Sequence, residues 1–182
     1  MKHLLVITAI TFYIAPWCLA DDSAFPGKFE TIGQGAVTSH GTAGCQSTPP
    51  YVCTIGSSGT ISGNVIGNGT FTSSLTIDYT TYRSNGSGGG CAQASGDFTI
   101  NASNGIIQAR QVGLLCEVGH TGLTAHTFNA TYWIDPVAST GAFAGSRGSG
   151  NLTASDDGPT GIHLLSHLDG VILVKVPIES NQ

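Results

Sequence analysis

The sequence predicts an all-β protein: a single antiparallel β-barrel of about eight strands, with a β-sandwich as the alternative. Three observations support this prediction. Apolar and polar residues alternate in several segments, turns containing glycine separate these segments, and no stretch shows two turns of an amphipathic helix. Hydrophobic residues make up 40% of the chain, so the 26 glycines fit ordered strands better than a disordered low-complexity chain.

The first twenty residues have the features of a secretory signal peptide. A basic start is followed by the apolar run Leu4–Ile14, and the small residue Ala20 precedes an acidic pair. The apolar run is shorter than the roughly 18 residues that a membrane-spanning helix needs. We therefore expect a signal peptide over residues 1–20, one domain over residues 21–182, and a secreted or periplasmic protein with no membrane span in its mature chain.

The first predicted strands are separated by glycines. Residues 28–40 contain β-branched residues and no helical period, which predicts a strand with a bulge at Gly33 or Gly35. Further along, Asn68 and Gly69 predict a tight turn.

The clearest single strand is predicted over residues 71–82. Apolar and polar residues alternate there with a period of two, which is typical of a strand with one face in water. The glycine-rich residues 84–90 then connect this strand to a hairpin. A phosphate-binding loop is not expected at this point, because such a loop precedes the N-terminus of a helix.

The segment from Cys91 to Cys116 is expected to form a β-hairpin whose register its own residues determine. The turn-forming residues 102–105 place the chain reversal there. Phe98 then faces Ala109, and such apolar pairs fall on one face of the hairpin while polar pairs fall on the other. The same register puts Cys91 opposite Cys116, within the roughly 4 Å between Cβ atoms that a disulfide needs.

Four cysteines remain after residue 20, and an even number in an exported chain predicts two disulfides. Three pairings are possible. If Cys91 pairs with Cys116 as the hairpin register indicates, Cys45 pairs with Cys53. Zinc binding is not expected, because no CxxC pair occurs.

Three more extended segments follow the hairpin: residues 123–135, 140–155 and 162–176. In the first, apolar residues from Phe128 to Ile134 share one side, and Pro136 ends the strand. About eight antiparallel strands would close into a barrel without exposed edges, with a filled or ligand-sized interior. An outer-membrane barrel is disfavoured, because only 8% of the residues are aromatic and the C-terminal tail is polar.

Residues 140–153, TGAFAGSRGSGNLT, followed by residues 168–172, LDGVI, carry glycines at characteristic spacings. They resemble the pattern TGxFxGaxGsGxxT and then LxGxI of small secreted barrels related to allene oxide cyclase and the dirigent proteins. The resemblance covers about the last quarter of the chain after residue 20, and it implies the barrel, because such glycines allow strongly coiled strands. It does not imply an activity, because no catalytic residue of the plant enzymes matches a position here.

Two residues are candidates for catalysis. Glu117 could act as a general base if it faces the mouth of the barrel, and His120 lies close to it in the chain. Trp133 has the opposite parity to its apolar neighbours, so its indole is expected to point outward, where it could bind a sugar or a protein partner.

Other polar residues receive structural interpretations. His163 and His167 are four residues apart, which spans about 13 Å on a strand, so one metal ion could not touch both. Asp156 and the residue after it are interpreted as turn residues. No metal site and no cofactor are expected.

The first functional hypothesis is an exported binding protein without enzymatic activity, whose partner is a small apolar ligand, a glycan or another protein. The alternative is an enzyme of the cyclase or isomerase kind with its site inside the barrel, and a structural surface protein is a third possibility. Nucleic acid is not an expected partner, because acidic residues outnumber basic ones by 11 to 6 and no basic run occurs. The interior discriminates between the first two: titratable groups around a cavity would favour an enzyme, and a dry, filled core would favour surface binding.

Overall fold

A computed structural model describes residues 24–40, 51–86, 89–118, 125–157 and 163–175. The regular elements in these residues are all β-strands. The described residues contain no helix long and apolar enough to cross a membrane. The strands are β1 (Ala24–His40), β2 (Val52–Gly63), β3 (Gly67–Ser84), β4 (Gly90–Ala102), β5 (Gly105–Val118), β6 (Ala125–Ile134), β7 (Thr140–Gly141), β8 (Arg147–Asp156) and β9 (Leu164–Lys175).

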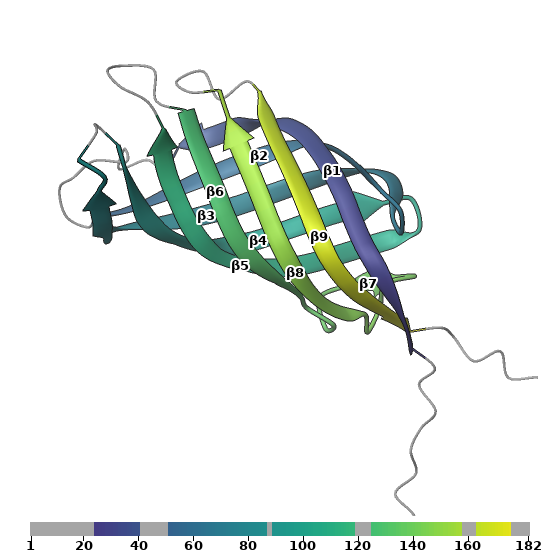
Figure 1. Ribbon diagram of the computed structural model, residues 1–182. Helices are drawn as coiled ribbons and strands as arrows, with labels where there is room; N and C mark the ends of the chain where they lie inside the picture. Colours follow the sequence, from purple (N-terminus) through teal and green to yellow (C-terminus); the bar gives the residue numbers. More distant parts are fainter. Residues whose placement is uncertain (1–23, 41–50, 87–88, 119–124, 158–162, 176–182) are drawn as a thin grey trace, which may run out of the picture.

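Eight of these strands form a closed antiparallel barrel, as predicted (Figure 1). Each strand pairs with the next along the chain from β1 to β6, then β6 pairs with β8, β8 with β9, and β9 returns to β1. The short strand β7 pairs only with the start of β5. Because the sheet closes on itself, the alternative of a β-sandwich is excluded.

The β4–β5 hairpin has the predicted register. Phe98 pairs with Ala109 and Cys91 pairs with Cys116, and these two cysteines form a disulfide with a Cα–Cα distance of 4.0 Å. Cys53 is also disulfide-bonded, and its predicted partner Cys45 lies outside the described residues. Disulfides of this kind are consistent with an oxidising environment.

The alternation of side chains sorts the strands into an apolar interior and a polar exterior. Tyr132 and Phe29 are both fully buried, and their rings meet edge to face with centroids 6.2 Å apart. Between them in the same transverse row lie Gly150 on β8 and Gly170 on β9. A Cβ atom on Gly170 would lie 2.6 Å from the Tyr132 hydroxyl, so these glycines make room for the ring.

One end of the barrel is closed by the segment between β6 and β8. Phe143 in this segment is 2% exposed and joins the hydrophobic core. Gly141 has a φ of 63° and pairs closely with Gly105 in the β4–β5 turn, which attaches the segment to the barrel. β5 ends and β6 begins at the opposite end of the barrel (Figure 1).

Two local predictions in the N-terminal half of the chain, a bulge and a turn, are wrong. The β1–β2 ladder is regular at Gly33 and Gly35, and its irregularity lies between Val37 and Ser39. The predicted turn at Asn68 and Gly69 is part of β3.

The turn itself lies earlier, between Gly63 and Gly67. Gly67 takes a φ of 65°, and the Asn64 side chain bridges to β1, accepting from Glu30 N at 3.1 Å and donating to the Lys28 carbonyl at 2.7 Å. A local turn signal could not reveal this contact with a strand more than thirty residues away.

Candidate functional site

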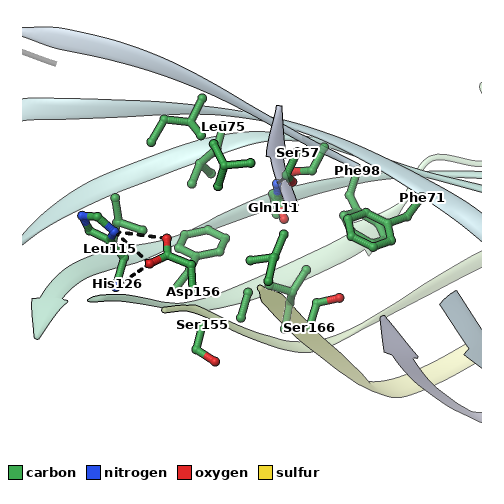
Figure 2. A pocket seen from close by; sticks show the side chains of 17 residues that line it. Ser57, Phe71, Leu75, Phe98, Gln111, Leu115, His126, Ser155, Asp156 and Ser166 are labelled. Carbon is green, nitrogen blue, oxygen red and sulfur yellow. Dashed lines mark hydrogen bonds and ion pairs between the residues drawn. The ribbon is translucent and has the colours of Figure 1, made fainter. Parts of the chain in front are cut away.

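A cavity of about 140 Å³ lies inside the barrel (Figure 2), and Phe143 is not among the side chains that line it. Most of the side chains around it are apolar, including Phe71, Leu75, Phe98, Phe128, Leu152 and Leu164. The polar side chains around it include Ser73, Gln111, His126, Asp156 and Ser166. Of the two interiors that the sequence left open, filled or ligand-sized, the structure contains an apolar chamber with a few polar groups in its wall.

The aromatic part of the wall is formed by Phe71 on β3 and Phe98 on β4. Their rings stack with centroids 5.4 Å apart and planes 15° from parallel, and both side chains are almost fully buried. Gly33 on β1 leaves space beside them, because a Cβ at this position would lie 3.2 Å from the Phe71 ring. Glycine at this position thus supports the shape of the cavity.

Gln111 contributes a buried amide group to the wall, with 2% of its surface exposed. Its Nε2 donates a hydrogen bond of 2.8 Å to Ser73 Oγ on β3. Burying an amide costs free energy unless it is hydrogen-bonded, and this bond offsets part of the cost. The pair provides one fixed polar patch in an apolar surface.

Ser166 on β9 is a second buried polar group of the wall, with 4% of its surface exposed. Its Oγ has no hydrogen-bond partner in the described part of the chain. It lies against Gly33, where any Cβ would collide with it. Thr31, Tyr132 and Ser146 also have buried hydroxyls without a partner, but they do not line the cavity.

The mouth of the cavity contains an ion pair between His126, near the start of β6, and Asp156, the last residue of β8. His126 Nδ1 lies 3.1 Å from Asp156 Oδ2, and the His126 backbone N donates to Asp156 Oδ1 at 3.0 Å (Figure 2). The hydrogen bond to Asp156 raises the pKa of His126, while burial opposes the rise. Since Asp156 occupies Nδ1, Nε2 is the ring nitrogen that can meet a ligand.

Glu117 lies beside this ion pair, because β5 and β6 pair Glu117 with His126. Its carboxylate accepts a hydrogen bond of 3.3 Å from the Tyr82 hydroxyl. Burial and the negative charge of Glu117 both raise the pKa of Tyr82. Glu117, His126 and Asp156 thus form a transverse row of titratable groups on three neighbouring strands at the mouth.

The other sites suggested by the sequence lie elsewhere. Trp133 points outward, as predicted, with 41% of its surface exposed, and it pairs with Arg110 and Ser149 on the neighbouring strands. His120 lies outside the described residues.

His163, just before β9, and His167, on β9, each lie beside a carboxylate. His163 contacts Asp157 at 2.5 Å and His167 contacts Glu30 at 3.6 Å, both at exposed positions. In the described part of the chain, no three His, Cys, Asp or Glu side chains are grouped as metal ligands.

The interpretation of Asp156 as a turn residue is wrong, because it ends β8 and points to His126. Its partner is 30 residues earlier in the chain, which no local pattern reveals. Gln111 could have been found from parity, because it continues the inward row of Ile107 and Ala109. Ser166 has the same parity as the inward Leu168 and carries the same signal.

Comparison of the chain with protein-family models, with curated proteins and with solved structures finds no match. The function is therefore argued from the site alone.

Proposed function

We propose that this protein is exported and binds a small, mainly apolar ligand inside the barrel. The observation that carries the proposal is the cavity of about 140 Å³ bounded by Phe71, Phe98 and aliphatic side chains. It is close in size to an engineered cavity of about 150 Å³ that takes up benzene. A ligand of about one six-membered ring fits the chamber, and a longer one would extend through the mouth.

Three further features support the proposal. The polar side chains are few and lie at separate points of an apolar wall, which is typical of sites that orient a ligand by a small number of hydrogen bonds. The Cys91–Cys116 disulfide agrees with an oxidising compartment and hence with export. The resemblance of residues 140–153 to small secreted barrels supports the same proposal.

Benzene titration tests the proposal. In the disulfide-bonded chain labelled with ¹³C at leucine methyls, benzene is expected to shift the resonances of Leu75 and Leu152 until they saturate. Ala154 lines the cavity from β8, and Ala154→Leu adds three carbon atoms to the lumen. This variant is expected to weaken benzene binding at least tenfold, because the added side chain occupies the site.

The matched control is Thr153→Leu, which places a leucine on the exposed outer wall at the residue before Ala154. It is expected to bind benzene as the unaltered chain does. Absence of saturable shifts in the unaltered chain, or equal binding by Ala154→Leu, would contradict the proposal.

An enzyme of the cyclase or isomerase kind is the second candidate, favoured by the row of Glu117, His126 and Asp156 at the mouth. A histidine oriented by a carboxylate can exchange a proton with a substrate, and a second carboxylate nearby can take the opposite role. The two candidates differ in what the protein does to its ligand.

Compounds that co-purify with the protein from its own host distinguish the candidates. Chromatography of the compounds released from the unaltered chain and from His126→Gln should show the same species if the protein only binds. A different compound accumulating on His126→Gln would identify a substrate and favour the enzyme.

A further inference from the structure

We infer that the ligand is a neutral compound bearing oxygen, an alcohol or a carbonyl compound, and that its oxygen hydrogen-bonds to Ser166 Oγ within the cavity. This inference rests on the proposed function and names the chemical class of its ligand.

Ser166 combines two properties in the described part of the chain. Its hydroxyl is buried without a hydrogen-bond partner, and its side chain lines the cavity. A buried hydroxyl without a partner destabilises the folded chain, so an alanine here would stabilise the empty protein. A ligand oxygen in the cavity would supply the missing hydrogen-bond partner. Ligand binding would then explain why a destabilising buried hydroxyl is present at this position.

Two other polar side chains of the wall already have hydrogen-bond or ion-pair partners. Gln111 Nε2 donates to Ser73 Oγ at 2.8 Å, and His126 Nδ1 is held by Asp156 at the mouth. Of the two buried polar side chains of the wall, Gln111 and Ser166, Ser166 is therefore the one that a ligand oxygen could meet without replacing an existing hydrogen bond.

The charges around the chamber favour a neutral ligand, because the positive charge of His126 is paired with Asp156. No lysine or arginine is among the cavity-lining side chains of the described chain. Asp156 lines the mouth and Glu117 lies next to His126, so a carboxylate or phosphate would meet like charges on entering. Burying an unpaired charge in an apolar chamber costs far more than burying a neutral oxygen.

Phenol and toluene test the inference. They have nearly the same shape, and phenol carries a hydroxyl group where toluene carries a methyl group. Their dissociation constants are measured by methyl shifts of Leu75 and Leu152 in the unaltered, disulfide-bonded chain and in Ser166→Ala. Ser166→Ala removes one atom, needs no new space and is expected to fold. It is expected to weaken phenol binding five- to tenfold, which corresponds to about 1–1.4 kcal/mol, and to leave toluene binding within twofold.

Thr31→Val is the matched control, because it removes another buried hydroxyl without a partner that lies away from the cavity. It is expected to change neither constant. If both probes bind but Ser166→Ala leaves their ratio unchanged, the inference is overturned and the proposed function stands. If neither probe binds the unaltered chain, the proposed function fails and the inference fails with it.

Discussion

At the scale of single residues, the mouth of the cavity depends on the charge of His126. Its side chain is about two-thirds shielded from solvent, with 32% exposed, and Asp156 is more buried, with 12% exposed. A partly buried pair of this kind is screened less by water than a surface ion pair. The protonated histidine therefore compensates the buried carboxylate, and each group holds the other in place.

Asp156→Asn is expected to lower the pKa of His126 toward its ordinary value of 6.5, because the hydrogen bond to the carboxylate is the largest cause of its rise. Titration of the His126 ring protons by NMR measures this change. Asp97→Asn, at an exposed position on the outer wall, should leave the midpoint unchanged. An unchanged midpoint in Asp156→Asn would show that the ion pair does not determine the charge of His126.

The same pair makes stability depend on pH. Because folding raises the pKa of His126, its contribution is fully present below pH 6.5 and is lost as pH rises through the folded pKa. In urea denaturation, the free energy of unfolding should therefore fall across this window. Asp156→Asn should flatten this dependence and cost about 1 kcal/mol at pH 6.

At the scale of strands, the inner row from Tyr132 to Phe29 shows why glycines recur in β8 and β9. Gly150 and Gly170 lie between the two aromatic side chains, in strands whose neighbouring backbones approach closely. A Cβ on Gly170 would lie 2.6 Å from the Tyr132 hydroxyl and 2.7 Å from Gly150 Cα. The glycine spacing in this part of the chain is thus a packing requirement of the interior.

Gly170→Ala is expected to lower the free energy of unfolding by about 1–3 kcal/mol, because the added methyl group overpacks the interior. Gly27→Ala on β1 is the control, since the nearest atom to its Cβ would be 3.9 Å away. That variant should change stability by less than about 0.5 kcal/mol. Urea denaturation of both variants measures the difference, and equal effects would refute the packing explanation.

At the scale of the whole molecule, the pairing of β1 with β9 closes the barrel. The ladder between them runs from Ala24 with Lys175 to Gly35 with Leu164. It joins the first and last strands of the described chain, so this ladder pairs the residues that lie farthest apart in the sequence. Phe29 is the fully buried aromatic side chain that the seam contributes to the core.

Phe29→Ala is expected to lower the free energy of unfolding by about 3–5 kcal/mol, as for other large buried aromatic residues. Ile32→Ala, on the same strand but 58% exposed on the outer wall, should cost less than about 1 kcal/mol. Guanidinium denaturation compares the two. Similar losses would mean that the inner and outer faces of β1 contribute alike, contrary to the burial pattern.

The strand pattern by itself determined the fold class and the hairpin register. Period-two alternation identifies which side chains share a face, and a recognisable turn at residues 102–105 then aligns two neighbouring strands. This alignment correctly paired Cys91 with Cys116. The information was sufficient because both partners lie in one hairpin.

The cavity and the ion pair at its mouth were decided only by the tertiary structure. Alternation places the Gln111 and Ser166 side chains inside the barrel. It does not determine how deep they lie or which strands they face. His126 meets Asp156 beside the β6–β8 ladder, and these two strands are joined by a long connection that contains β7, not by a tight turn that would set their register. Whether the interior is filled or hollow depends on the summed volumes of inward side chains from eight strands, a property of the closed barrel and of no single segment.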